Sequence, residues 1–143
     1  MGASAASVAP TLAGSLADPN PRVRSLAAVA LRAMGPNAAA AITALVTALN
    51  DPSAYVRALA ADTLGNIGPA AKPAVPALTS HLLATNEQVV FVLRSVAQAL
   101  GNIGPEAAGA LPALEQALKM PRVTYTAQEA IHKIKREPVS TWY

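Results

Sequence analysis

Cysteine is absent from the 143 residues, and aromatic and charged residues make up only 3% and 13% of the chain. Without cysteine there are no disulfides, no thiolate metal ligands and no cysteine nucleophile. Scarce aromatic residues disfavour a β-sheet. No apolar run reaches the roughly 18 residues of a membrane span, and the first ten residues lack the pattern of a signal peptide. We therefore expect a cytoplasmic protein that does not enter a membrane.

The residues that dominate the chain are small and apolar. Alanine is the most frequent residue, and the hydrophobic fraction is 52%. Because alanine has the highest intrinsic helix propensity, this composition favours thin helices that pack closely. The length fits one domain of ordinary size with a core of its own. The composition therefore predicts a single all-α domain.

The sequence also repeats itself. The segment DPNPRVRSLAAVALRAMGP (18–36) aligns with DPSAYVRALAADTLGNIGP (51–69) after a shift of 33, and with EQVVFVLRSVAQALGNIGP (87–105) after a further 36. A last shift of 31 reaches a fourth, partial copy. Apolar residues recur in each copy at offsets of 8 and 3, which follow one face of an α-helix. These residues are Val23, Leu31 and Met34; Val56, Leu64 and Ile67; Val92, Leu100 and Ile103; and Val123, Ile131 and Ile134.

A second helix follows each of these, and its apolar residues repeat as well. They are Ile42, Leu45 and Leu49; Val75, Leu78 and Leu82; and Leu111, Leu114 and Leu118, with Ala9, Leu12 and Leu16 on the same template upstream. We name the first helix of each unit A and the second B. The chain then consists of about eight helices in the order B–A–B–A–B–A–B–A. A single apolar stripe cannot be buried by one helix alone, so neighbouring units must stack.

Two kinds of dipeptide separate the helices. Asp-Pro at 18–19 and 51–52 marks the turn from B to A, with Asp as the expected N-cap and Pro at the first helical position. Gly-Pro at 35–36, 68–69 and 104–105 marks the turn from A to B, with the glycine in a left-handed conformation. The string LGNIGP, at 64–69 and 100–105, is therefore a helix end and not a nucleic-acid clamp of the Gly-x-x-Gly type, because its inner residues are helical.

These units resemble HEAT repeats, specifically the short HEAT-like type named after phycobilisome lyase subunits. The pattern that carries the resemblance is D-P-x-x-x-V-R-x-x-A-A-x-x-L-x-x-[IM]-G-P, and the likeness covers about residues 5–135. It implies a right-handed α-solenoid with A helices on the convex face and B helices on the concave face. We expect one domain at 1–137 and a tail at 138–143. Its units are 1–17 (half), 18–50, 51–85, 86–120 and 121–137 (half).

Members of this family often stack an Asp and an Arg of successive units into a ladder. The resemblance therefore implies a structural role for Asp18, Arg24, Asp51 and Arg57. The third unit has Glu87 and Leu93 at these two positions, and the fourth has Thr124 at the Arg position. We expect the ladder to fade toward the C-terminus.

Catalytic chemistry finds no support in the sequence. His81 lies beside core residue Leu82, where a satisfied or exposed histidine is the simpler interpretation. Glu129 and His132 have the i, i+3 spacing of di-iron bundles, but the HEAT-repeat di-iron hydroxylase needs several His-Glu dipeptides and none occurs here. Glu129 more simply pairs with Lys133. We predict a protein that is not an enzyme and that has no cofactor and no metal.

The net charge of +3 raises the question of nucleic acid. Residues 1–118 contain six basic and six acidic residues, so the whole excess lies in 119–137. The residues beside each B-helix stripe are small and uncharged, which makes a poor electrostatic groove. Weak nucleic-acid binding through the basic C-terminal helix is thus only the third hypothesis, behind two in which the partner is a protein.

The first hypothesis is a protein-interaction scaffold that binds a partner on its concave B-helix face, since solenoids bind along such surfaces. Its expected polar contacts are Thr47, Ser80, His81, Arg94 and Gln116. The alternative is an accessory subunit of a multi-subunit enzyme, such as a bilin-lyase-type complex. The end helices also predict a head-to-tail homo-oligomer. The rival to that assembly is a tail in which Trp142 and Tyr143 fold back as a lid.

Overall fold

The computed structural model describes residues 2–84 and 87–136, and every element in these ranges is helical. Residues 1, 85–86 and 137–143, including Trp142 and Tyr143, lie outside the described residues. The α-helices are α1 (Gly2–Ser15), α2 (Pro21–Met34), α3 (Ile42–Ala48), α4 (Ala54–Ile67), α5 (Val75–Leu83), α6 (Val90–Ile103), α7 (Leu111–Ala117) and α8 (Thr124–Lys135). Three 3₁₀ helices lie between them: η1 (Gly35–Ala41), η2 (Gly68–Ala74) and η3 (Gly104–Ala110).

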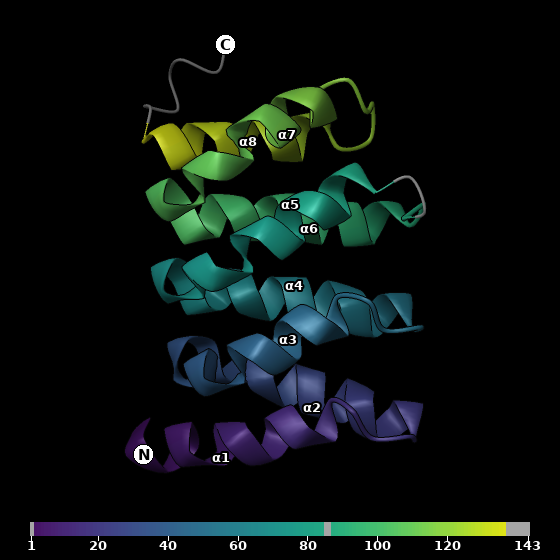
Figure 1. Ribbon diagram of the computed structural model, residues 1–143, viewed down its shortest axis with the longest axis vertical. Coiled ribbons are helices and arrows are strands. Elements are labelled where there is room, and N and C mark those ends of the chain that lie inside the picture. Colours follow the sequence, from purple (N-terminus) through teal and green to yellow (C-terminus); the bar gives the residue numbers. More distant parts are fainter. Residues whose placement is uncertain (1, 85–86, 137–143) are drawn as a thin grey trace.

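The helices stack in layers along one axis, from α1 at one end to α8 at the other (Figure 1). The A helices are α2, α4, α6 and α8, and the B helices are α1, α3, α5 and α7. All connections from B to A lie on the same side of the stack, at the right of Figure 1, and we call this the loop side. The 3₁₀ helices lie on the opposite side. The predicted all-α solenoid is confirmed.

The three 3₁₀ helices change the predicted helix count. Each joins an A helix to the following B helix without a break, so the described residues form five continuous helical segments instead of about eight separate helices. The chain changes direction at a glycine with positive φ, +82° at both Gly68 and Gly104. Their ψ values, −146° and −148°, differ from the left-handed helical values that the sequence predicted. Glycine is the residue that adopts this region readily.

The N-caps also differ from the prediction. Asn20 caps α2 by accepting a hydrogen bond from the Arg22 amide, and Ser53 caps α4 by accepting one from the Val56 amide. Asp18 and Asp51 lie two residues earlier, where their carboxylates accept hydrogen bonds from the amides of Asn20 and Ser53. The aspartates therefore fix the turn before the helix, and their other oxygens remain available to a partner.

The core is one continuous column between the A and B helices. In each helix from α2 to α7 a leucine of the predicted stripe is fully buried: Leu31, Leu64 and Leu100 from A helices, and Leu45, Leu78 and Leu114 from B helices. Alanines fill the remaining positions, among them Ala38, Ala71 and Ala107 of the 3₁₀ helices. Small residues let neighbouring helices approach closely, as the composition indicated.

Two glycines mark the closest approach between A helices. A Cβ atom placed on Gly65 of α4 would lie 2.9 Å from the Cα of Ala99 in α6, and one on Gly101 would lie 2.9 Å from the Cα of Ala130 in α8. The first repeat has Arg32 at the equivalent position, and its guanidinium reaches the Asp62 carboxylate at 3.9 Å. The repeated glycines, Gly65 and Gly101, thus serve helix packing.

The joined segment Pro21–Ala48 is long and apolar enough, by length and composition alone, to cross a membrane. Its backbone turns at Gly35, which divides it into α2, of 14 residues, and a B helix with the 7 residues of α3. A membrane-spanning helix needs about 20 consecutive apolar residues. Both helices contribute leucines to the core, so we assign the segment to the solenoid.

Candidate partner-binding surface

An ion-pair ladder runs along the loop side of the stack and links successive repeats. Arg24 Nε lies 2.8 Å from Asp51 Oδ2, across the boundary between the first and second full repeats. The same guanidinium donates from Nη1 to the carbonyl oxygen of Asp18, at 3.0 Å. One arginine thus ties its own connection and the next one together. Its side chain is 15% exposed and that of Asp51 only 5%.

The second rung repeats this arrangement. Arg57 Nε lies 2.7 Å from Glu87 Oε2, and Arg57 Nη1 donates to the carbonyl oxygen of Asp51 at 2.9 Å. Glu87 therefore accepts the arginine of the preceding repeat, as Asp51 does one repeat earlier. Its side chain is longer, and its connection differs in length. Of the four residues predicted for the ladder, Arg24, Asp51 and Arg57 form ion pairs that join adjacent repeats, whereas Asp18 contributes its backbone carbonyl to Arg24.

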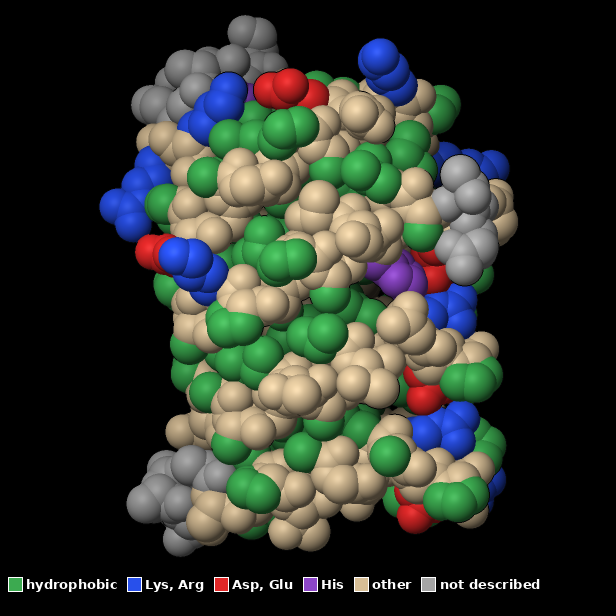
Figure 2. Space-filling model, viewed as in Figure 1, with side chains coloured by type: hydrophobic (Ala, Val, Ile, Leu, Met, Phe, Trp, Pro, Cys, Tyr) green, Lys and Arg blue, Asp and Glu red, His purple; other side chains and the backbone are tan. Residues whose placement is uncertain are grey.

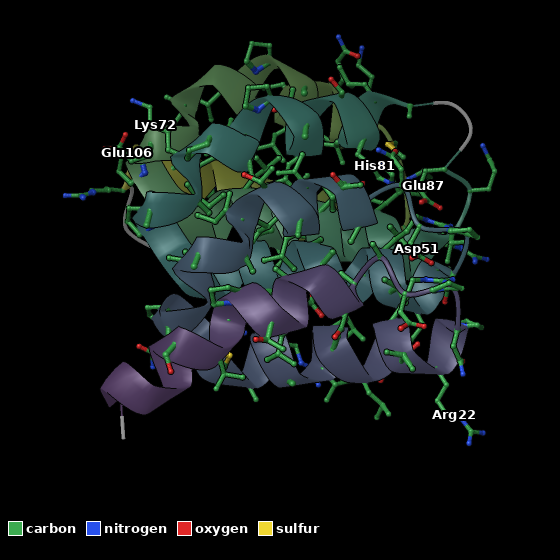
Figure 3. The ribbon with its side chains drawn as sticks, turned by 60° about the horizontal axis from the view of Figure 1, so that its bottom comes forward. Arg22, Asp51, Lys72, His81, Glu87 and Glu106 are labelled. Atoms are coloured by element: carbon green, nitrogen blue, oxygen red, sulfur yellow. The ribbon has the colours of Figure 1, made fainter. Side chains whose placement is uncertain are left out.

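His81 joins the second rung from the B-helix side. Its Nε2 lies 3.0 Å from Glu87 Oε2, and only 12% of its side chain is exposed. Burial alone would raise the pKa of the Glu87 carboxyl. Hydrogen bonds from Arg57, His81 and the Val89 amide, together with the charge of Arg57, outweigh burial and hold that pKa below its ordinary value. Figure 3 shows Asp51, His81 and Glu87 together on the loop side, opposite Lys72 and Glu106. His81 is therefore a structural, partly buried residue.

The ladder ends at the third repeat, as expected. Leu93 occupies the arginine position and is buried. The next residue, exposed Arg94, donates from Nε to the backbone carbonyl of Arg122 at 2.9 Å. Among the described residues no ion pair joins the α5–α6 connection to the α7–α8 connection.

A large hollow lies where the rung is missing. It has a volume of about 640 Å³ and lies between the ends of α5 and α7 and the start of α6. Apolar side chains line much of it: Leu82, Leu83, Val90, Leu93, Met120 and Val123. Gln88, Gln116 and Arg122 supply polar groups at the same hollow. A second hollow of about 240 Å³ opens between α3 and α5, and its lining includes Val46, Ser80 and His81.

The B-helix face that runs beside these hollows is almost uncharged. Figure 2 shows hydrophobic and uncharged polar groups over its middle, with most charged side chains toward its two sides. Thr47, Ser80 and Gln116 are exposed on α3, α5 and α7. Ser80 and His81 line the smaller hollow and Gln116 lines the larger one. Thr47 donates to the Thr43 carbonyl within its own helix, 3.3 Å away.

Arg94 does not join the other four residues predicted to contact a partner. It lies on A helix α6 and not on the B-helix face, and its guanidinium binds the α7–α8 connection. Arg94 directly follows the arginine position of the ladder, and from this position one could have predicted that it faces the α7–α8 connection.

The C-terminal helix makes internal contacts with its polar residues. Lys133 Nζ lies 3.3 Å from Glu129 Oε1, as the i, i+4 spacing predicted, and 3.1 Å from the amide oxygen of Asn102 in α6. Within the two described ranges no group of three His, Asp or Glu residues is placed to hold a metal ion. Lys135 and Arg136, at the end of α8, are exposed.

The sequence matches the family of HEAT repeats over residues 42–135 and a HEAT repeat over residues 8–38. No curated protein matches it significantly. Among solved structures, an engineered protein aligns with a TM-score of 0.68 and 27% identity, covering 90% of this chain and 62% of that one. Another engineered protein aligns with a TM-score of 0.64 and 28% identity, covering 89% and 37% of the two chains.

A natural complex is also among the similar structures. The complex of CpcE and CpcF of phycocyanin lyase from Nostoc sp. PCC7120 aligns with a TM-score of 0.73 and 28% identity, covering 93% of this chain and 55% of that chain. This chain therefore spans less than two thirds of each of the three similar structures.

Proposed function

This chain belongs to the HEAT-repeat family, and from that premise we propose that it is a non-catalytic protein-interaction module whose B-helix face binds a partner protein. The observation that carries the proposal is the pair of hollows on the loop side of that face, between α3 and α5 and at the missing rung. Both combine an apolar lining with a few polar groups, which suits the anchoring side chains of a partner.

The rest of the B-helix face supports the same interpretation. Its exposed residues on α3 and α5 are uncharged, with Thr47 and Ser80 among them, so a partner backbone can approach there without desolvating charges. The polar groups at the hollows, Gln116 and Arg122, can give direction to hydrogen bonds at the rim of such an interface. A solenoid presents an extended surface of this kind, along which a partner can bind.

Two matched substitutions test the proposal. Gln116→Arg places a bulky charge at the larger hollow, while Gln98→Arg makes the same change at an exposed glutamine of A helix α6. Proteins retained by the immobilised unmodified chain are identified by mass spectrometry, and the affinity of a purified partner is then measured by calorimetry. We expect Gln116→Arg to weaken binding by about tenfold or more and Gln98→Arg to leave it almost unchanged. Equal affinities for the two variants would refute the B-helix face as the binding surface.

A second candidate function is an accessory subunit of a multi-subunit enzyme. The likeness to the CpcE–CpcF complex of phycocyanin lyase favours it, since that structure is a complex of two subunits of an enzyme. In this case the partner recovered with the chain is catalytic, and its turnover rises when the purified chain is added. A partner whose activity is the same with and without the chain would leave the scaffold as the better description.

A further inference from the structure

We propose that the end of the solenoid formed by the outer side of α2 and the carboxylate of Asp18 is a second protein-binding site, distinct from the B-helix face, and that it docks an arginine-bearing A helix of another helical-repeat polypeptide. The two inner repeats of this chain show what covers the equivalent surface, and they define the chemistry of the occupant.

The apolar half of the site follows from the stacking of A helices. Asn66 of α4 donates to the Arg32 carbonyl of α2, 3.5 Å away, so Asn66 faces the preceding A helix. Thr63 and Leu59 lie on the same stripe, three and seven residues before it, and are 0% and 2% exposed. The residue of α2 equivalent to Leu59 is Leu26, and it is 64% exposed. Leu26 is therefore a packing residue that no described residue covers.

The smaller residues of α2 agree with this assignment. Ala30 and Ala33 occupy the positions of Thr63 and Asn66 on the same stripe, and Ala33 is exposed. Together with Leu26 they form an uncharged strip that is narrow enough for the close helix contact seen between α4 and α6. Burying an exposed leucine in such a contact is favourable, because it removes apolar surface from water.

The polar half of the site is an acceptor for arginine. Asp51 and Glu87 each receive the arginine of the preceding repeat. Asp18 is the equivalent acid of the first full repeat, and the same kind of backbone bond holds its carboxylate: the Asn20 amide donates to Asp18 Oδ1 at 2.8 Å, as the Ser53 amide does to Asp51 Oδ1 at 2.9 Å. Within the described part of the chain, Asp18 has no ion-pair partner.

The apolar and polar halves of the site, compared with the inner repeats, indicate which residues the occupant helix must carry. Arg57 of α4 reaches the following acid, and Gly65, eight residues later, lets the next A helix approach. An A helix with an arginine and, eight residues on, a glycine would therefore pair with Asp18 and cover Leu26 at once. This helix would contact Asp18 and Leu26 as α2 contacts Asp51 and Leu59 inside the chain.

A second copy of this chain does not meet that specification. At the end of its own stack, α8 has Thr124 at the arginine position and His132 at the glycine position. The Thr124 hydroxyl donates to the Leu118 carbonyl at 2.8 Å, within its own connection. The head-to-tail homo-oligomer predicted from the sequence would therefore lack the ladder rung and the close approach. The site instead favours a different helical-repeat polypeptide.

The test supplies an occupant of this chemistry from the chain itself. A full-length donor with Thr124→Arg and His132→Gly acquires the Arg–Gly spacing of α4 at its C-terminal end, and Leu26→Asp in the donor disables its own acceptor end. The donor carries a fluorescent label and is titrated with the unmodified chain. We expect saturable binding by fluorescence anisotropy, and a weakening of about tenfold or more when the acceptor carries Asp18→Asn or Leu26→Asp.

The control acceptor carries Phe91→Asp, because Phe91 is also a large exposed apolar residue, 50% exposed, but lies on α6 away from this end. It should bind the donor like the unmodified chain. Circular dichroism checks that each variant is folded. If the donor with all three substitutions does not fold, a donor that carries only Thr124→Arg and Leu26→Asp replaces it. Absence of donor binding, or binding that Asp18→Asn and Leu26→Asp leave unchanged, would overturn the proposal. Neither result bears on the B-helix face.

Discussion

At the scale of single residues, Glu87 has the most specialised environment in the described chain. It is 6% exposed and accepts hydrogen bonds from Arg57, His81 and the Val89 amide. The cost of burying a carboxylate is offset only if such donors surround it. Because the contacts come from three elements, the protonation of this one residue affects how the second and third repeats are held together.

These contacts predict a pH dependence of stability. The pKa of Glu87 is lowered in the folded state, so its ionised form stabilises the fold. This contribution is complete above the unfolded-state pKa, about 4.3, and is lost as the pH falls through the folded-state value. Glu87→Gln should therefore lower the melting temperature at pH 7, and the difference from the unmodified chain should shrink as the pH falls below about 4.

Thermal unfolding followed by circular dichroism at several pH values measures this difference. Glu106→Gln is the control, because Glu106 is exposed and its one ion pair among the described residues is with exposed Lys72, at 3.3 Å. A surface pair of this kind contributes little, so its loss should change the melting temperature slightly at every pH. If the Glu87→Gln difference were the same at pH 3 and pH 7, the ionised carboxylate would not be what stabilises the second rung.

At the scale of elements, A helices pack against each other through backbone contact at glycine. Gly65→Ala would place a methyl group 2.9 Å from the Cα of Ala99, and a backbone atom cannot turn aside as a flexible side chain can. Overpacking of this kind costs about 1–3 kcal/mol, against a gain of roughly 1 kcal/mol in helix propensity. We expect a net loss of stability, measured as a lower midpoint of urea unfolding.

Gly14→Ala provides the matched control, because Gly14 also lies in a helix, α1, but a Cβ there would meet no atom within 4 Å. Only the propensity gain of roughly 0.5–1 kcal/mol then remains, so this substitution should raise the midpoint. The opposite signs of the two changes are the prediction. A Gly65→Ala chain that is more stable than the unmodified one would mean that α4 and α6 separate at little cost.

The same elements show what the sequence could and could not predict. The apolar stripes gave the helices and the core correctly, because an offset of 8 and 3 admits only one helical face. The N-caps were wrong, since Asn20 and Ser53, two residues beyond the aspartates, are equally good caps and only the backbone decides between them. The 3₁₀ joints were missed because alanine-rich segments such as 37–41 fit a turn and a short helix alike.

The candidate site was predicted less completely than the fold. B-helix periodicity fixes the direction of Ser80, His81 and Gln116, and in the structure these residues line the two hollows. Their contact with a partner stays a prediction. The larger hollow was not predicted, since it depends on how the ends of α5 and α7 and the start of α6 lie relative to one another, which the repeat spacing does not give. The role of Glu87 as the second acceptor required knowing that ladder pairs join different repeats, which the spacing within one repeat does not reveal.

At the scale of the whole molecule, stability is distributed along one axis. Each repeat contacts only its neighbours, so the free energy of the stack is approximately a sum of repeat and interface contributions. The interfaces here are unequal. The first two have ladder rungs, at Arg24–Asp51 and Arg57–Glu87, whereas the third relies on close packing at Gly101 and on Arg94. The two ends of the stack differ as well: the outer side of α2 has exposed Leu26, and α8 at the other end has His132.

This inequality predicts graded protection from hydrogen exchange. The amides of α4 should exchange most slowly, because α4 has an A helix and a ladder rung on each side. Those of α1 and α8, each at an end of the described stack, should exchange faster. Asp51→Asn removes the first rung, so it should accelerate exchange in α1 and α2 more than in α8. Exchange measured by mass spectrometry on peptides from each helix checks both expectations. Equal acceleration in α2 and α8 would mean that the stack opens only as one cooperative unit, and the ladder would then have no local role.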